Sequence, residues 1–228
     1  MLDRLELLIG TENVEKLKNM TILVVGVGGV GGYAIEALAR SGIGHLILVD
    51  YDKVDITNKN RQLIALDSTI GLKKIDVWEK RILDINKDCK VTKVDCFLSE
   101  DNFHILDDFS IDYLIDACDT VKTKKLLIKK CLNEKIPFIS SMGTGNKLDP
   151  SKLEIVDIRK TSYDPLAKII RKFVKEERLN GKVMVLSSKE IPISTGSTTI
   201  ASCSFVPSSA GLLIASYIIR QVISKKNI

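Results

Sequence analysis

The 228-residue sequence predicts an α/β fold with a doubly wound, mainly parallel sheet and additional C-terminal strands and helices. Two observations support this prediction. Short apolar runs alternate with segments of helical periodicity as far as residue 141, which is typical of parallel strands joined by right-handed crossover helices. In addition, a glycine-rich turn, GVGGVG, directly follows the first apolar run. The combination favours a sheet whose ligand site lies at the carboxyl ends of its strands.

The elements follow one another along the chain without a linker or an internal repeat. The expected strands cover residues 21–26, 45–50, 90–97, 112–116 and 137–141, and the expected helices cover residues 29–41, 71–85, 100–107 and 120–134. Beyond Met142 we expect a loop at 143–151, strands at 153–158 and 183–187, a charged helix between them and an apolar C-terminal helix. We therefore expect residues 1–228 to form a single domain.

Composition and charge narrow the class of protein. The net charge is +5, and the first residues carry Arg4 and Glu6 where a secretory signal would be apolar, so we expect a cytoplasmic protein. The five cysteines form no CxxC pair, which argues against a disulfide framework and against structural zinc. Pro207 and Arg220 interrupt the apolar segment 205–223. We expect a packed helix there rather than a stable membrane span, with peripheral membrane association left open.

The glycine-rich turn predicts a Rossmann-like phosphate site. Gly26, Gly28 and Gly31 have the GxGxxG spacing, which permits a tight turn, lets a phosphate approach the backbone and allows the helix to pack closely on the strand. The unpaired N–H groups at the start of that helix would face an anion. Asp50 ends the second strand, where a carboxylate can bind ribose hydroxyls. We include Gly29 among the predicted nucleotide contacts, because it lies in the same turn.

The loop after the second strand distinguishes ATP from NAD. The stretch DYDKVDITNKNRQ is crowded with polar side chains, and Lys74 follows near the start of a predicted helix. A pentavalent transition state at an α-phosphate spreads negative charge over its oxygens, so a fixed guanidinium and ammonium stabilise it more than the ground state. Arg61 and Lys74 are the candidates for these groups. Asp119, after the fourth strand, is placed to hold Mg²⁺ beside the phosphates.

Taken together, GVGGVG, LVDYDKVDITNKNRQ, GLKK and DACDT resemble the adenylate-forming superfamily related to ubiquitin-activating enzymes. This resemblance implies ATP as the bound nucleotide. It also implies homodimers in which Arg4 reaches the partner's ATP site. The residues that it assigns to catalysis are Arg4, Arg61, Lys74 and Asp119. The residues that it adds to the glycines as ATP contacts are Asp50, Asn58, Arg61, Gln62, Lys74 and Asp119.

The second half of the chain resembles one branch of that superfamily, the tRNA threonylcarbamoyladenosine dehydratases, through VDIRKTSYDPLAKIIRKFVKEERL, KVMVLSSKE and GSTTIASCSFVPSSAGLLIASYIIRQVI. The resemblance implies adenylation of the threonylcarbamoyl carboxylate on a tRNA adenosine beside the anticodon, followed by ring closure with release of AMP. It also allows sulfur-transfer proteins as partners.

Two alternatives stay open: adenylation of the C-terminus of a ubiquitin-like sulfur-carrier protein, and a nucleotide-binding scaffold without turnover. The missing CxxC pairs disfavour the first alternative. Cys118 lies between two aspartates and invites a thioester step, although a small buried thiol is the commoner state. An internal nucleophile of the substrate makes such a covalent step unnecessary.

The charged helix predicts a contact with RNA. Asp164 is placed to cap it, with Pro165 as its first residue, and Leu166, Ile169, Ile170 and Phe173 share a predicted apolar face. The predicted tRNA contacts, on the opposite face, are Lys168, Arg171, Lys172 and Lys175. A solvated charged face is the simpler interpretation of such a pattern. A second candidate surface for tRNA is the cluster Lys122, Lys124, Lys125 and Lys129.

Overall fold

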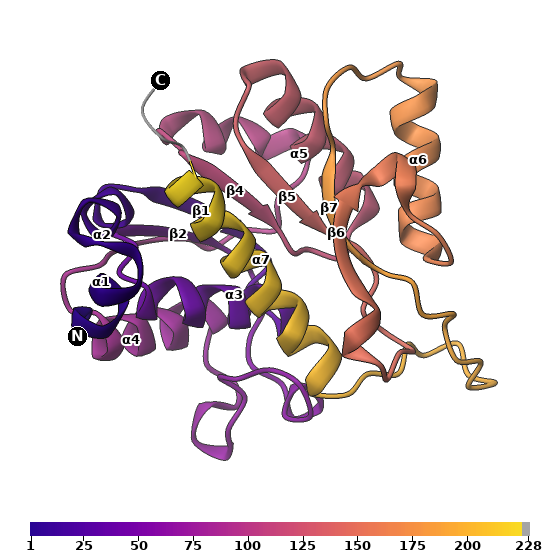
Figure 1. The fold of residues 1–228 in the computed structure, drawn as a ribbon. Helices are drawn as coiled ribbons and strands as arrows, with labels where there is room; N and C mark the ends of the chain where they lie inside the picture. Colours follow the sequence, from indigo (N-terminus) through magenta and orange to yellow (C-terminus); the bar gives the residue numbers. More distant parts are fainter. Residues whose placement is uncertain (225–228) are drawn as a thin grey trace.

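The computed structural model describes residues 1–224 and contains a seven-stranded sheet in the order β3-β2-β1-β4-β5-β7-β6 (Figure 1). The strands are β1 (Thr21–Val25), β2 (His45–Val49), β3 (Lys90–Val94), β4 (Tyr113–Asp116), β5 (Phe138–Ser141), β6 (Leu153–Asp157) and β7 (Met184–Ser188). The helices are α1 (Asp3–Ile9), α2 (Thr11–Lys18), α3 (Gly29–Arg40), α4 (Lys74–Ile85), α5 (Val121–Glu134), α6 (Pro165–Glu176) and α7 (Phe205–Ser224).

All strand pairs are parallel except the pair formed by β6 and β7 at one edge. The strand order reverses beside β1, which pairs with β2 on one side and with β4 on the other. Loops that leave this point in opposite directions open a crevice at the carboxyl ends of the strands. The predicted doubly wound, mainly parallel α/β fold with additional C-terminal strands and helices is therefore confirmed.

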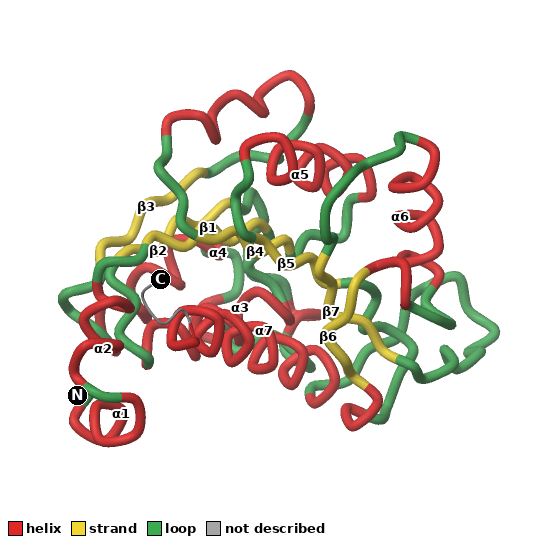
Figure 2. Tube along the Cα trace, turned by 45° about the horizontal axis from the view of Figure 1, so that its top comes forward, coloured by secondary structure: helices red, strands yellow, loops and turns green. Residues whose placement is uncertain are grey.

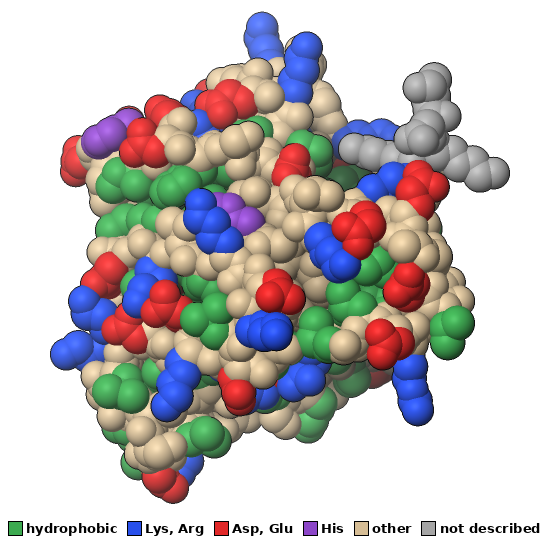
Figure 3. Space-filling view, turned by 90° about the vertical axis from the view of Figure 1, so that its left-hand side faces the viewer, with side chains coloured by type: hydrophobic (Ala, Val, Ile, Leu, Met, Phe, Trp, Pro, Cys, Tyr) green, Lys and Arg blue, Asp and Glu red, His purple; other side chains and the backbone are tan. Residues whose placement is uncertain are grey.

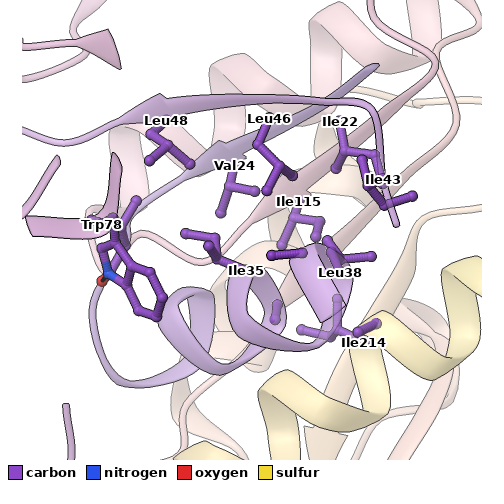
Figure 4. Close-up of a cluster of buried hydrophobic side chains, with 14 of the residues drawn as sticks. Ile22, Val24, Ile35, Leu38, Ile43, Leu46, Leu48, Trp78, Ile115 and Ile214 are labelled. Carbon is purple, nitrogen blue, oxygen red and sulfur yellow. Dashed lines mark hydrogen bonds between the residues drawn. The ribbon is translucent and has the colours of Figure 1, made fainter. Parts of the chain in front are cut away.

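Helices cover both faces of the sheet, with α3 and α7 on one side and α5 and α6 on the other (Figure 2). Successive side chains of a strand point to opposite faces. Ile22 and Val24 accordingly belong to the core under α3, whereas Leu23 and Val25 belong to the core under α5. Because both faces are buried, the strands are continuous apolar runs rather than alternating ones. Figure 4 shows the first core, in which Trp78 of α4 closes one end.

Helix α7 packs closely against α3. A Cβ at Gly211 would lie 2.3 Å from the carbonyl oxygen of Val30 and 2.8 Å from the amide nitrogen of Ala34, so only glycine permits this contact. By length and composition alone α7 could cross a membrane, and 39% of its most apolar stretch is buried in the fold. The expected packed helix is present, and Leu212 and Leu213 on its other side are exposed.

Several element boundaries differ from the expected ones. The helix expected from residue 71 begins at Lys74, because Gly71 has φ +85° and Lys73 is extended and bridged to Lys53. The segment expected as a helix at 100–107 is a 3₁₀ helix, Glu100–Asp108, and the strand expected at 90–97 ends at Val94. Helices α1 and α2 precede the sheet and were not among the expected elements.

Candidate nucleotide site

A cavity of about 730 Å³ opens at the carboxyl ends of the central strands. Its walls come from the glycine turn, the loops after β2, β3 and β4, the 141–147 segment and the start of α6. Most of the predicted ATP residues line it. They are Gly26, Gly28, Gly29, Asp50, Asn58, Arg61, Gln62, Lys74 and Asp119. The fold thus brings together residues from three loops that are far apart in the sequence.

The glycines of the turn have different roles. Gly26 has φ +85°, and a Cβ there would lie 2.8 Å from the backbone of Ala117, so it lets the turn approach β4. A Cβ at Gly31 would lie 1.9 Å from the carbonyl oxygen of Gly26, which places α3 directly against the turn, and Gly31 is absent from the cavity lining. Gly28 and Gly29 face the cavity, where an added Cβ would meet only side chains at 3.4 Å.

Asp50 fastens the end of β2 to this turn. Its Oδ2 accepts a hydrogen bond from Val27 N at 2.8 Å, and its Oδ1 accepts one from Asp52 N at 2.9 Å. A carboxylate oxygen can accept more than one hydrogen bond, so Asp50 can also bind hydroxyl groups in the cavity. The same carboxylate therefore shapes the phosphate turn and lines the site.

The segment with Asn58, Arg61 and Gln62 forms a short turn in the cavity wall, where Arg61 and Gln62 lie beside Gly29 and Gly28. Asn58 is buried, and its Oδ1 caps the turn by accepting from Asp55 N. Gln62 is also buried, and its Oε1 has no hydrogen-bond partner among the described residues 1–224. An orphaned polar atom in a cavity wall calls for an explanation, such as a bound polar group. Gln62 is therefore suited to contact a donor on a nucleotide.

Lys74 is the first residue of α4, and its Nζ lies 2.7 Å from Asp52 Oδ2. The Lys74 side chain is only 6% exposed, whereas that of Asp52 is 45% exposed. An anion in the cavity could therefore draw the ammonium toward itself while Asp52 turns to solvent. The neighbouring Lys73 pairs with Asp95 and does not line the cavity.

Asp116 and Asp119 occupy different environments at the end of β4. Asp119 is exposed and lines the cavity. Asp116 is fully buried beneath it, 3.0 Å from Lys124 Nζ, and accepts a hydrogen bond from Ser140 Oγ. Lys124 Nζ also donates to Ser141 O at 2.8 Å. Because Lys124 is fully buried, it cannot belong to a tRNA-binding surface, and that part of the second candidate cluster is wrong.

Cys118 lines the cavity, and its thiol is held beside Asp116. Its Sγ lies 3.1 Å from Asp116 Oδ1. Burial, followed by the charge of Asp116, raises the pKa of the Cys118 thiol far above its usual range. The thiolate is the nucleophilic form of cysteine, so a protonated thiol is poorly suited to thioester formation.

An aromatic pair in the cavity wall was not singled out from the sequence. Tyr51 and Phe97 follow β2 and β3, and their rings meet edge to face with centroids 5.1 Å apart. Both side chains are about half exposed. Exposed aromatic faces beside a polar cavity suit a planar base. Their position directly after adjacent parallel strands is the signal that could have identified them.

The basic helix α6 starts at the cavity. Asp164 caps it through Ala167 N, and its other oxygen lies 3.1 Å from Lys147 Nζ in a buried ion pair. The expected cap and the proline at the first position are present. Ile169 is 45% exposed and was wrongly placed on the apolar face, because the core under α6 is centred on Ile170 and Val174.

The four predicted tRNA contacts of α6 are not equivalent. Lys168, Lys172 and Lys175 are exposed. Arg171 is partly buried, and its guanidinium donates to Thr161 O at 2.9 Å and to Thr161 Oγ1 at 2.6 Å. These bonds tie the helix to the loop before it, so Arg171 has a structural role here. Among the α5 lysines, Lys125 and Lys129 lie over the ring of Phe173.

Arg4 lies far from the cavity of its own chain. It belongs to α1, and the adjacent Leu2 contacts the region of Gly42, just beyond the end of α3. Helix α3 begins at the cavity and has 12 residues, which separates its two ends by about 18 Å. Arg4 does not line the cavity. Any role of Arg4 in the site would therefore require a second copy of the chain.

Residues 1–224 include no group of three or more histidine, cysteine, aspartate or glutamate side chains that could hold a metal ion. A magnesium ion at Asp119 would therefore need further ligands from a bound nucleotide or from water, which is the usual situation for this ion beside phosphates.

Known proteins resemble this chain over nearly its whole length. The ThiF family model matches residues 2–227. A tRNA threonylcarbamoyladenosine dehydratase from Bacillus subtilis (strain 168) is 45% identical, with 96% of this chain and 93% of the relative covered. The protein of the same name from Escherichia coli (strain K12) is 42% identical over 75% of this chain, and the match spans 63% of that relative.

The fold agrees with these matches. The crystal structure of E. coli tRNA N6-threonylcarbamoyladenosine dehydratase in complex with ATP superimposes with a TM-score of 0.91 and 35% identity, covering 96% of this chain and 92% of that one. This chain, which contains the GxGxxG turn, the NKNRQ segment and the cavity that they line, thus agrees with these relatives in both fold and family. This protein belongs to the ThiF family, in the branch of the tRNA threonylcarbamoyladenosine dehydratases.

Proposed function

We propose that this protein uses ATP to adenylate the carboxylate of the threonylcarbamoyl group on a tRNA adenosine next to the anticodon. Diphosphate leaves as the acyl-adenylate forms, and the group then closes into a ring as AMP leaves with one carboxylate oxygen, so the nucleoside loses the elements of one water overall. The observation that carries this proposal is the convergence of Arg61, Lys74 and Asp119 on one cavity beside the glycine turn. The relatives named for this dehydratase activity, and the ATP complex of one of them, support it.

The residues of the cavity have different proposed roles in this reaction. Gly28 and Gly29 leave room for phosphates at the N-terminus of α3, whose N–H groups favour an anion. Arg61 and Lys74 stabilise the charge that develops on the α-phosphate as the substrate carboxylate attacks and diphosphate leaves. The ring nucleophile belongs to the substrate, so proximity replaces a covalent enzyme intermediate.

Magnesium fits this site through its oxygen ligands. We propose that Asp119 holds Mg²⁺ together with the ATP phosphates, because its carboxylate is exposed to the cavity and hard cations prefer oxygen donors. The ion would neutralise part of the phosphate charge. Asn58 and Gln62 would also contact ATP, and the unpartnered Gln62 Oε1 supports such a contact.

We propose that the functional unit is a homodimer. Helix α1 buries none of its residues, and Leu7 and Leu8 are 89% and 79% exposed. Exposed leucines on a helix that buries none of its residues suit a protein interface. Figure 3 shows the face seen from the side of α1 and α2, where apolar side chains lie among charged ones. In a dimer, Arg4 could reach the partner's ATP site.

We propose that the tRNA backbone follows α6 away from the cavity. Pro165 and Leu166 line the cavity, and Lys168, Lys172 and Lys175 lie further along the same helix. A nucleoside inserted in the cavity would therefore place its flanking phosphates near these ammonium groups. Such a substrate suits a cytoplasmic enzyme, and neither membrane association nor a sulfur-transfer partner is needed for the reaction.

The decisive experiment supplies the purified protein with ATP, Mg²⁺ and tRNA that carries threonylcarbamoyladenosine. We expect substrate-dependent diphosphate release and a nucleoside that has lost one water by mass analysis. Calorimetry should show ATP binding and no comparable NAD binding. Diphosphate release with a sulfur-carrier protein instead of tRNA would favour the carrier-activating alternative. ATP binding without turnover on either substrate would favour a scaffold.

A further inference from the structure

The side chain of Asn60 joins two segments that are 142 positions apart in the sequence. Its Oδ1 accepts a hydrogen bond from Arg61 Nη1 at 2.8 Å. Its Nδ2 donates to Ser202 O at 3.0 Å. The acceptor of one amide group therefore holds Arg61 while its donor holds a distant loop.

Asn60 can influence the reaction only through its neighbours. It is exposed and does not line the cavity, whereas Arg61 and Ser202 both do. Within residues 1–224, Arg61 Nη1 has one other partner, Thr57 O at 3.0 Å. Arginine has a long side chain with much rotational freedom, so a second fixed acceptor narrows the positions that its guanidinium can take.

The segment directly before Ser202 is closed by Asn146, a cavity residue with φ +57°. Asn146 O accepts from Ile193 N at 2.8 Å, Asn146 N donates to Ala201 O at 2.8 Å, and Asn146 Oδ1 accepts from Ala201 N at 2.7 Å. Both ends of the segment 193–201 are thus attached to the cavity wall. We call this segment the 193–201 loop.

The 193–201 loop also reaches the cavity itself. Ile200 lines it, and a Cβ at the adjacent Gly145 would lie 2.2 Å from Ile200 Cγ2. The intervening residues, STGSTT, are exposed. A substrate that enters beside Ile200 therefore meets this loop. Ser202, whose carbonyl oxygen accepts from Asn60, directly follows the loop.

We propose that Asn60 is a positioning residue that couples the 193–201 loop to the Arg61 guanidinium. A substrate that contacts the loop thereby favours the orientation in which Arg61 serves the α-phosphate. This inference rests on the proposed function for the identity of that substrate, although the coupling itself involves only ATP and the loop. Coupling between two sites is reciprocal, so ATP must in turn change the stability of the loop.

The kinetic test uses Asn60→Ala, Asn146→Ala and the double variant, with tRNA-dependent diphosphate release as the readout. Because one exposed hydrogen-bond link is lost, we expect Asn60→Ala to lower kcat about 3- to 10-fold, with less than about a 2-fold change in KM for ATP. The double variant should be no slower than the slower single one, because both act through one loop. Asn19→Ala is the matched control, since that amide donates to Glu15 O on α2.

Asn60→Asp separates the two contacts of Asn60. The new carboxylate keeps an acceptor for Arg61 but has no donor for Ser202 O. Asn146→Ala should therefore lower kcat much less in the Asn60→Asp background than in the wild type. The coupling would be overturned if Asn60→Ala kept the wild-type kcat. It would also be overturned if the fold-loss of kcat in the double variant equalled the product of the two single losses.

A second readout needs no tRNA and so distinguishes this inference from the proposed function. Amide hydrogen exchange at Ile193 and Ala201 should slow when ATP binds to the wild type, and should not respond to ATP in Asn60→Ala. If wild-type protein exchanges these amides equally fast with and without ATP, the coupling is wrong. If ATP slows exchange but tRNA causes no turnover, the coupling stands and the proposed substrate is wrong.

Discussion

Lys124 Nζ lies 3.0 Å from Asp116 Oδ1, and both side chains are almost completely excluded from solvent. The pair joins α5 to the end of β4 directly beneath the cavity floor. Asp116 Oδ1 also accepts from Cys118 N at 3.3 Å, at the start of the turn that leads to Asp119. The geometry of that turn therefore depends on a lysine five residues further along the chain from Asp119.

Breaking this pair should destabilise the protein. Lys124→Met would leave the Asp116 charge buried without compensation, and we expect a loss of about 3 to 5 kcal/mol in the free energy of unfolding, measured in urea. Adding Asp116→Asn to Lys124→Met should recover part of the loss. The control is Lys122→Met, an exposed lysine of the same helix. Equal losses for Lys122→Met and Lys124→Met would contradict the role of the pair.

If Arg61 and Lys74 are the proposed transition-state donors, Arg61→Ala and Lys74→Ala should each lower turnover by roughly 100-fold or more. ATP affinity, measured by calorimetry, should fall much less. Lys73→Ala is the matched control for Lys74→Ala, since the neighbouring lysine pairs with Asp95 outside the cavity. Full turnover in Arg61→Ala or in Lys74→Ala would remove that residue from the mechanism.

Cys118→Ala should remain active, because the ring closes within the substrate. Burial and the adjacent Asp116 raise the pKa of the thiol, so it stays protonated at neutral pH. We accordingly expect alkylation of Cys118 to be slow in the wild type. The rate can be measured by mass analysis of the labelled peptides. An inactive Cys118→Ala variant with wild-type stability would revive a thioester intermediate.

Arg4 can be tested by complementation between two inactive chains. If Arg4 acts across a dimer, a chain with Arg4→Ala mixed with a chain with Lys74→Ala should yield about one working site per heterodimer. Activity should be absent from either homodimer and present in the verified heterodimer. A heterodimer as inactive as its parents would exclude a shared site.

The exposed lysines of α6 predict a salt effect on tRNA binding. Each phosphate contact lowers the logarithm of affinity by about 0.7 to 0.9 per unit of log salt concentration. Lys168→Ala with Lys175→Ala should weaken binding in a filter assay and flatten that slope by roughly 1 to 2 units, with ATP binding unchanged. Lys87→Ala with Lys90→Ala, near the opposite end of the strands, is the control. An unchanged slope in the α6 variant would mean that this helix face is merely solvated.

Arg171 is best left out of that experiment. Its guanidinium holds Thr161 through two hydrogen bonds, so Arg171→Ala would disturb the loop before α6 as well as remove a charge. The helical pattern places Arg171 beside the exposed lysines, but it cannot reveal a partner ten residues away. Position on a helix therefore predicts exposure less well for a long side chain than for a short one.

The sequence by itself determined the sheet, the glycine turn and most of the cavity lining. Apolar runs at Thr21–Val25 and His45–Val49 determine buried parallel strands, since both of their faces must be apolar. Asp50, Arg61 and Lys74 follow from local spacing, because the ends of parallel strands meet at one edge whatever the packing beyond them. The cap at Asp164 is equally local, since its oxygen bonds an amide three residues away.

Only the tertiary structure decided which charges are buried and which distant segments meet. Lys124 belongs to a run of lysines, yet it shares a helix face with Leu127 and Ile128 and enters the core because Asp116 compensates its charge there. Asn60 meets Ser202, and Arg4 lies away from the cavity, for reasons that no local pattern contains. Local patterns are set by the period of a helix or strand, whereas the pairing of side chains from remote segments depends on how those elements pack.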